Sequence, residues 1–326
     1  MFLTQSQIEQ ITFGALEIYR DQNDVYRFKR LTDYQAKEFD SEHVEFGVEI
    51  PATAGVRFDF YTDSEFLSVK FADVMPGSVS RFWYSFDLYI NGKLSQTFMQ
   101  DGYDVKDGEI YAKLNGDNNR IQLFFPCLAN GGIQSVELSD GATVTPFTPK
   151  YKWLALGDSI TQGFDAKMSS CTYANIVARE LDAEIINQAI GGARFQKEQL
   201  DYTGEYDFIT VAYGTNDWYV RNSLEELLGY CDDYFKTFAQ IYPNTKKFAI
   251  LPIWRKHWYN EKPTGDFFVC RTAIADTAKK YGITPLESID YVTHDSLFFK
   301  DLTLHPNDLG FVVYAKNLLK DLKELI

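Results

Sequence analysis

Three polar residues in the second half of the chain have side chains that could together cleave an ester. Ser159 lies in Gly-Asp-Ser-Ile-Thr-Gln-Gly (157–163), and Asn216 and His305 follow far along the sequence. Serine becomes a nucleophile when a base takes its proton, and histidine has a suitable pKa for that role. The amide of asparagine can donate to a developing oxyanion, which a carboxylate could not do. Each residue alone is equally compatible with ordinary loop or helix-capping roles.

A fourth segment could supply a backbone donor. Asn-Gln-Ala-Ile-Gly-Gly (187–192) ends in Gly191 and Gly192, and glycine lets a backbone N–H come close to a reacting oxygen. By itself, such a glycine pair predicts only a turn. No Gly-Lys-Ser/Thr follows Gly157 at the spacing of a phosphate-binding loop, so the pattern does not indicate nucleotide binding.

The elements needed to position these residues alternate between strands and helices from Tyr151 onward. Apolar runs predict strands, and apolar residues at helical spacing predict helices. The predicted strands are 152–157, 184–187, 207–213, 246–253 and 283–286, and the predicted helices are 171–182, 223–241, 266–281 and 307–324. This alternation is typical of a parallel sheet covered on both faces. Since ligands bind at the carboxyl edge of such sheets, the loops carrying Ser159, Gly192 and Asn216 should converge there.

The first half of the chain predicts a different architecture. Short aromatic or alternating segments are separated by turn residues and indicate a β-sandwich. The predicted strands are 43–50, 55–61, 67–71, 82–90, 120–125 and 133–138, with Asn91-Gly92 as a hairpin turn. Prolines among threonines near residue 146 indicate a short linker. We therefore expect a β-sandwich domain over 1–145, a linker over 146–150 and an α/β domain over 151–326.

Composition restricts the classes of partner and cofactor. The 326-residue chain has a net charge of −14, which argues against binding to nucleic acid or to an anionic membrane surface. Its four cysteines and four histidines show no metal-ligand or disulfide spacing, so we expect neither a metal nor another cofactor. The N-terminal residues lack the pattern of a secretory leader, which favours a cytoplasmic location. The sequence does not fix the oligomeric state, and a homo-oligomer is compatible with it.

Taken in order, the four segments GDSITQG, NQAIGG, GTND and LHPND resemble the blocks of the SGNH/GDSL hydrolase family. The resemblance covers about residues 151–326 and implies a flavodoxin-like three-layer α/β/α fold with serine esterase activity. It implies that Ser159 is the nucleophile and His305 the general base. It also implies that the N–H groups of Ser159 and Gly192 and the side-chain amide of Asn216 form the oxyanion hole. Ser-Phe-Asp-Leu-Tyr (85–89) is similar to the GxDLY-type, jelly-roll-like sandwich that precedes some family members, with Ser85 replacing the first glycine.

One position departs from the family pattern. The family usually has aspartate three residues before the histidine, where this chain has Leu302, and Asp301 lies one residue further back. We expect Asp301 to orient His305 despite the extra residue. The alternatives are a backbone carbonyl or another acid such as Asp295. We interpret Asp158 and Asp217, which flank the other site residues, as structural anchors of their loops.

The substrate is predicted from aromatic residues near the expected site. Trp218, Tyr219 and Trp254 could restrict the acyl group to a short one such as acetyl and could stack on a sugar ring, although packing between domains is equally compatible. Resemblance to sandwich-bearing family members favours deacetylation of a small-molecule or oligosaccharide ester. The alternatives are a general short-chain carboxylesterase or thioesterase, and a non-catalytic carbohydrate-binding protein.

Overall fold

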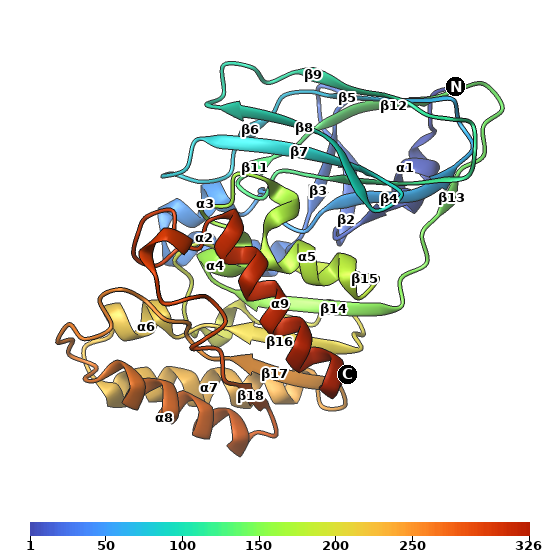
Figure 1. Ribbon diagram of the computed structural model, residues 1–326. Helices are drawn as coiled ribbons and strands as arrows, with labels where there is room; N and C mark the ends of the chain where they lie inside the picture. Colours follow the sequence, from blue (N-terminus) through green and yellow to red (C-terminus); the bar gives the residue numbers. More distant parts are fainter.

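A five-stranded parallel sheet forms the centre of the C-terminal half in the computed structural model, which describes residues 1–326 (Figure 1). The strand order is β15 (Ala183–Asn187), β14 (Tyr151–Gly157), β16 (Phe208–Ala212), β17 (Lys246–Ile250) and β18 (Thr284–Leu286). This is the flavodoxin-like order, in which the chain reverses direction across the sheet next to the first strand. The strands are mostly apolar because both faces of the sheet are covered.

Two pairs of helices cover that sheet. On one face α5 (Tyr173–Glu180) packs beside α9 (Asp308–Leu325), and on the other α7 (Leu224–Ile241) packs beside α8 (Phe267–Lys280). The predicted three-layer α/β/α fold is therefore confirmed. Short helical turns complete this half: α4 (Ser159–Gln162), η1 (Ser169–Cys171), η2 (Lys197–Gln199), α6 (Thr215–Val220) and η3 (Ser296–Phe298).

The N-terminal half contains two antiparallel sheets that enclose an aromatic core. One has the order β1 (Thr12–Phe13), β4 (Arg57–Thr62), β10 (Asn119–Phe124), β7 (Trp83–Ile90) and β8 (Lys93–Asp101). The other has the order β2 (Glu17–Arg20), β3 (Tyr26–Lys29), β12 (Ile133–Leu138), β5 (Phe66–Phe71) and β9 (Gly108–Lys113). A two-stranded ladder joins β6 (Met75–Pro76) to β11 (Ala129–Asn130). Between the sheets, Phe125 makes edge-to-face contacts with Phe28 and Phe58 at ring distances of 5.0 and 4.9 Å.

The predicted sheets are accompanied by three helices that were not predicted. These are α1 (Gln5–Ile11), α2 (Asp33–Glu42) and α3 (Val44–Glu49), and α3 replaces the strand predicted over 43–50, which was wrong. The side chain of His43 caps α3 by accepting from the N–H of Glu45, and Phe46 turns inward. The alternating sequence there resembles a strand, but a helix allows Phe46 to pack on the parallel-sheet domain.

The segment between the two halves is anchored rather than free. β13 (Thr145–Pro146) pairs with β4, so the sheet continues into the segment predicted as a linker. The N–H of Phe147 also donates to the carbonyl of Asp59 at 3.1 Å. Only a few residues remain before β14 begins at Tyr151.

Strand β7 is buried on both faces, because one face packs in the sandwich core and the other packs against the parallel-sheet domain. Trp83 donates from Nε1 to the carbonyl of Ala166 at 2.8 Å, and Asp87 accepts from the N–H of Ser170 at 2.7 Å. The intervening side chains enter the sandwich core: Tyr84, Phe86 and Leu88. The Asp-Leu-Tyr segment therefore lies at the seam between the two halves.

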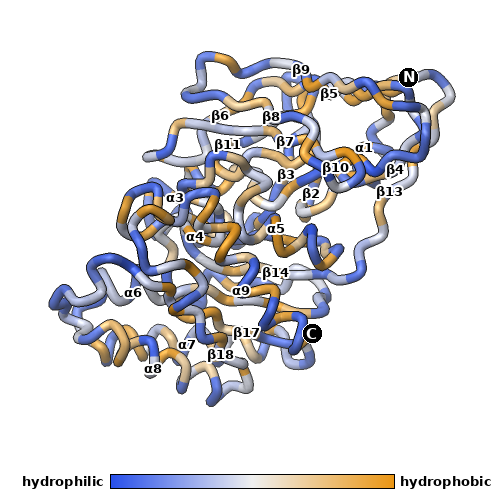
Figure 2. The backbone as a smooth tube through the Cα atoms, viewed as in Figure 1, coloured by the Kyte–Doolittle hydropathy of each residue, from blue (hydrophilic) through white to orange (hydrophobic).

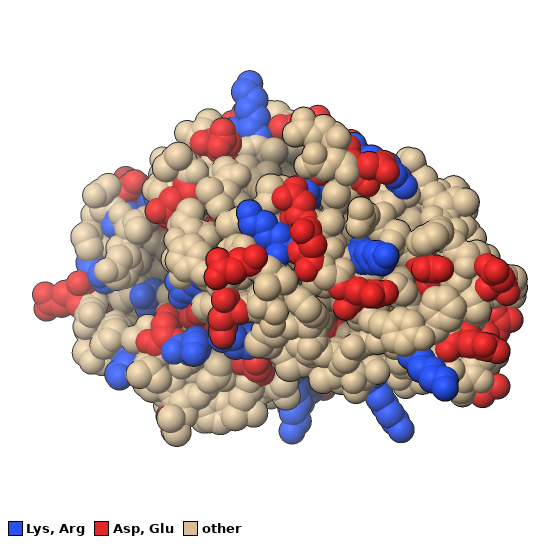
Figure 3. Space-filling view, turned by 90° about the horizontal axis from the view of Figure 1, so that it is seen from above, with Lys and Arg blue, Asp and Glu red and all other residues tan.

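Apolar residues lie mainly inside the molecule, and charged residues of both signs lie on its surface. Hydrophobic positions concentrate in the strands and the inner faces of the helices (Figure 2). On the face seen in Figure 3, acidic and basic side chains are interspersed, and neither sign forms a continuous area. None of the helices combines the length and the apolar character needed to cross a bilayer.

Candidate active site

Ser159 is positioned by the end of the central strand β14. Asp158 caps the short helix α4 by accepting from the N–H of Ile160 at 3.0 Å, and Ser159 is the first residue of that helix. A Cβ atom at Gly157 would lie 2.3 Å from Oγ1 of Thr161, so only glycine fits this tight exit from the strand. Ser159 is thereby held at the carboxyl edge of the sheet, with 5% of its surface exposed.

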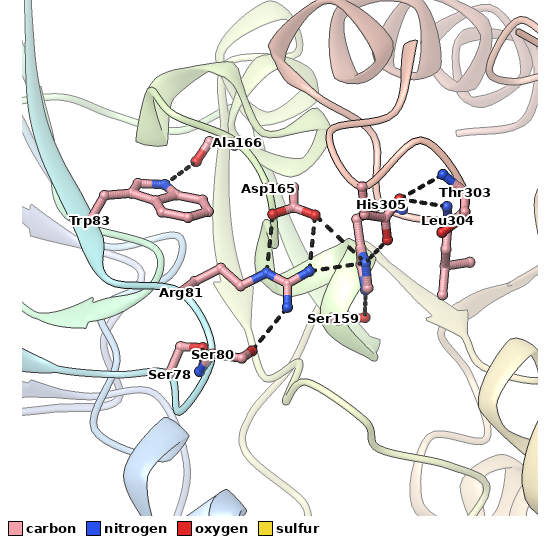
Figure 4. Close-up of polar contacts among 11 residues, drawn as sticks. Ser78, Ser80, Arg81, Trp83, Ser159, Asp165, Ala166, Thr303, Leu304 and His305 are labelled. Carbon is pink, nitrogen blue, oxygen red and sulfur yellow. Dashed lines mark hydrogen bonds and ion pairs between the residues drawn. The ribbon is translucent and has the colours of Figure 1, made fainter. Parts of the chain in front are cut away.

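A continuous chain of contacts joins Ser159, His305 and Asp301. Oγ of Ser159 lies 2.8 Å from Nε2 of His305 (Figure 4), and Nδ1 of His305 lies 2.7 Å from Oδ2 of Asp301. Because an ionised carboxylate can only accept, Nδ1 carries the proton and Nε2 is free to accept from the serine hydroxyl. The arrangement has the geometry of a nucleophile, a base and an orienting acid.

A left-handed turn accommodates the extra residue between Asp301 and His305. Leu302 has a φ of +62°, and Oδ1 of Asp301 accepts from the N–H groups of Thr303 and Leu304, both at 2.8 Å. Burial tends to raise the pKa of Asp301, but the hydrogen bonds from His305 and Leu304 outweigh it and hold the pKa well below its usual range. The carboxylate is therefore ionised and rigidly held beside the imidazole.

The other loops converge on the same edge of the sheet. Gly191 donates to Oε1 of Gln162 at 2.7 Å, and Nδ2 of Asn216 donates to the carbonyl of Ala193 at 3.1 Å. Gly192 has a φ of +79°, and its N–H has no acceptor within the protein. Asn216 carries a second N–H on the same nitrogen. Gly192 and Asn216 thus both retain a donor in the loops beside Ser159.

The three remaining aspartates named in the sequence analysis have structural partners. Asp217 is buried and pairs with Arg221 at 3.1 Å, and burial raises its pKa to about 6 despite that partner. Burial raises the pKa of Asp158, the helix cap, to about 7. Asp295, the alternative orienting acid, is exposed and caps η3 through the N–H of Leu297.

The predicted substrate-binding aromatics lie in three different environments. Trp218 is 1% exposed and donates from Nε1 to the carbonyl of Gly265, so it has no free face for a substrate and the prediction for it is wrong. Tyr219 is 53% exposed, with Nζ of Lys262 3.5 Å from its ring centre. Trp254 is half-buried and stacks on the ring of His294.

Two charged residues at the site were not predicted. Nε and Nη2 of Arg81 each lie 3.0 Å from an oxygen of Asp165, and Oδ2 of Asp165 lies 3.7 Å from Nδ1 of His305 (Figure 4). Arg81 precedes β7, so it comes from the sandwich domain. The only sequence signal was its proximity to the Asp-Leu-Tyr segment, and nothing in the pattern paired it with Asp165. Asp165, Asp301 and His305 could geometrically hold a metal ion, but Arg81 already supplies the cation for Asp165.

Helix α3 covers the glycine loop from the sandwich side. A Cβ atom at Gly192 would lie 3.4 Å from the ring of Phe46, and one at Gly191 would lie 2.6 Å from Oε2 of Glu49. That oxygen of Glu49 is buried without a hydrogen-bond partner. Burial raises the pKa of Glu49 to about 8. The helix missed by the prediction therefore packs directly on the candidate oxyanion loop.

Residues 155–312 match the model of the GDSL-like lipase/acylhydrolase family. The C-terminal half of this chain is therefore an acylhydrolase domain of that family, preceded by an antiparallel β-sheet region. No curated protein sequence matches the chain.

Solved structures share the fold of both halves at low sequence identity. Salicylyl-acyltransferase SsfX3 from a tetracycline biosynthetic pathway is 19% identical with a TM-score of 0.78, over 96% of this chain and 94% of the other. A family two carbohydrate esterase from Clostridium thermocellum, in complex with cellohexaose, is 12% identical with a TM-score of 0.64, over 96% and 98%. An acetyl xylan esterase from Butyrivibrio proteoclasticus is 14% identical with a TM-score of 0.56, over 83% and 90%. The two-part architecture is thus common to an acyltransferase and to carbohydrate esterases.

Proposed function

We propose that this protein is a serine esterase that removes short acyl groups, acetyl foremost, from carbohydrates. The observation that carries the chemistry is the unbroken contact from Ser159 through His305 to Asp301, with 2.8 and 2.7 Å between the joined atoms. In this proposal His305 takes the proton of Ser159 as its oxygen attacks the acyl carbonyl. The alcohol then leaves with a proton from His305, and water releases the acyl group from the serine by the reverse sequence.

The oxyanion formed in each step needs nearby hydrogen-bond donors. Gly192 contributes a backbone N–H without a partner in the protein, and Asn216 contributes the N–H that does not bind Ala193. In this proposal the N–H of Ser159 adds a third donor. Donors fixed before the reaction stabilise the developing charge without reorganising, which is why such groups accelerate acyl transfer.

The acyl acceptor is proposed from the folds that resemble this one. Structures with both halves include carbohydrate esterases, one of them bound to cellohexaose, and an acetyl xylan esterase. The exposed ring of Tyr219 offers a surface on which a sugar could stack. Because Trp218 is buried and Trp254 is only partly exposed, Tyr219 carries this part of the proposal.

Acetate release from a panel of acetylated oligosaccharides tests the proposal, with wild type compared to Ser159→Ala. Release that depends on Ser159 supports carbohydrate deacetylation. Cleavage of 4-nitrophenyl acetate but of no sugar ester would favour a general carboxylesterase, and cleavage of acyl thioesters a thioesterase. Activity that persists in Ser159→Ala, or failure of a serine-directed phosphonate to label wild type, would contradict the serine mechanism. Cell fractionation tests the proposed cytoplasmic location.

A further inference from the structure

His305 contacts a charged pair that the esterase chemistry described above does not use. Arg81 and Asp165 form a two-pronged ion pair, with 3.0 Å separating the nitrogen and oxygen of each contact. Nη2 of Arg81 lies 3.4 Å from Nδ1 of His305, and Oδ2 of Asp165 lies 3.7 Å from the same nitrogen. Arg81 also lies over the ring of Phe164, which packs beside the imidazole. Figure 4 shows that the guanidinium of Arg81, the carboxylate of Asp165 and the imidazole of His305 each contact the other two.

The pair is nearly closed to solvent. The side chain of Asp165 is 4% exposed and that of Arg81 is 20% exposed, so water screens their charges only weakly. Nδ1 of His305 already donates to Asp301, and Arg81 has only donors, so Arg81 and His305 cannot form a hydrogen bond through Nδ1. Arg81 therefore acts on the imidazole through its charge and through its hold on Asp165.

The charges around His305 determine how the pair of Arg81 and Asp165 affects protonation of the imidazole. Asp301 and Asp165 both favour the imidazolium, whereas Arg81 disfavours it. Further out, Arg255 is close enough to Asp301 for their charges to interact. Glu49 lies near Arg81 but carries no charge until it loses its proton at a pH of about 8. With Arg81 present, its positive charge balances the negative charge of Asp165. Asp301 alone is then left to stabilise the imidazolium formed during catalysis. Without Arg81, two unbalanced carboxylates would face the ring and would keep it protonated at higher pH.

We propose that Arg81 is a positioning residue by which the sandwich domain completes the active site, balancing Asp165 so that His305 remains neutral and available as a base. This inference rests on the proposed role of His305. It also assigns a function to the seam along β7. Trp83 and Asp87 hold β7 against residues 166–170. Because Arg81 lies just before this strand, the same contacts place its side chain beside the imidazole.

The test is the protonation equilibrium of His305, followed by NMR of the imidazole in the full chain. The His305→Gln variant identifies its signal among the four histidines. We expect Arg81→Met to raise the pKa of His305 by about one unit, and Asp165→Asn to lower it by a similar amount. Combining both changes should return it towards the wild-type value. Arg81→Lys, which keeps the charge, should leave it close to wild type.

Arg120→Met is a matched control, because Arg120 also crosses the seam to pair with Asp182, away from His305. It should leave the titration of His305 unchanged. The acid limb of kcat/KM for 4-nitrophenyl acetate should move with the NMR titration in each Arg81 and Asp165 variant. An unmoved titration, or shifts in the same direction for Arg81→Met and Asp165→Asn, would overturn the proposal. Because NMR needs no substrate, this result is independent of whether the protein cleaves esters. If Arg81→Met does not fold, Asp165→Asn and Arg81→Lys still decide between the outcomes.

Discussion

Oδ2 of Asp301 lies 2.7 Å from Nδ1 of His305, although the two residues are separated by one residue more than the usual family spacing. The left-handed conformation of Leu302 takes up the difference, and the other oxygen of Asp301 ties the turn together through backbone N–H groups. A carboxylate in this position fixes which ring nitrogen carries the proton. The relationship between these two residues makes a sharp mutational test possible.

Asp301→Asn should lower kcat by about 10³–10⁴-fold while leaving the protein folded. The asparagine amide can donate to Nδ1, which would favour the tautomer that cannot accept the serine proton. Steady-state kinetics on an ester substrate would measure the effect. Asp295→Asn is the control, since Asp295 caps η3 away from the imidazole and its loss should change kcat only slightly. A larger loss for Asp295→Asn than for Asp301→Asn would refute the assignment.

Asn216→Ala should lower kcat by about 10²–10³-fold, which corresponds to about 2.7–4 kcal/mol of lost transition-state stabilisation. KM should change little, since the donor acts mainly on charge that appears during the reaction. Asn222→Ala provides the comparison: this asparagine is exposed and binds only Glu226 at the start of α7. Equal kinetics for the Asn216 and Asn222 variants would remove Asn216 from the oxyanion hole.

Gly192→Ala should reduce both stability and activity. Alanine at a φ of +79° costs about 1 kcal/mol, and a backbone shift that relieves this strain would move the N–H; the added Cβ itself would only touch the ring of Phe46. Gly282 has a similar φ of +70° but open space around it, so Gly282→Ala should show a similar strain and no loss of kcat. Urea unfolding and kinetics on both variants separate the two effects. Full activity in Gly192→Ala would argue against this N–H as a donor.

Glu49 should make the protein less stable as pH rises. In the unfolded chain Glu49 loses its proton near its ordinary pKa, whereas the folded protein keeps the proton until pH of about 8. Between these values the unfolded state binds fewer protons, so the free energy of unfolding falls with increasing pH. Glu49→Gln cannot ionise, and its stability relative to wild type should rise by about 2–4 kcal/mol across this window.

Denaturant unfolding of wild type and Glu49→Gln at several pH values between these limits would measure that difference. Glu45→Gln is a control on the same helix, because the side chain of Glu45 is half exposed. Its stability difference from wild type should depend little on pH. A constant difference for Glu49→Gln across the window would show that the carboxyl ionises normally in the folded protein.

The parallel-sheet half could be predicted from sequence because its signals are local. Apolar runs become β14 to β18, and Ser159, Gly192, Asn216 and His305 each lie in a short segment beside a strand or helix end. Residues 43–50 were mistaken for a strand because helix α3 is selected by packing of Phe46 on a distant loop. Trp218 was wrongly predicted to bind substrate, because its burial depends on residues distant in the sequence, such as Gly265, and no local pattern indicates it.

Arg81 and Asp165 were missed for a related reason. They are separated by more than eighty positions and belong to different halves of the chain, so only the docking of the two domains reveals that they meet at His305. Charged residues that pair across a seam leave no periodic pattern in either segment. The orienting role expected for Asp301 was easier to anticipate, because it depends on a single loop.

Successive side chains of β7 point alternately into the sandwich core and towards the parallel-sheet domain, so the register of this strand is fixed. A single inserted or deleted residue would exchange its faces. Phe86 would then meet the polar backbone of residues 166–170, and Ser85 would enter the aromatic core of the sandwich. The same slip would withdraw Arg81 from Asp165. Selection should therefore act against insertions and deletions in β7. A sandwich domain taken from another protein would support activity only if its corresponding strand kept this register.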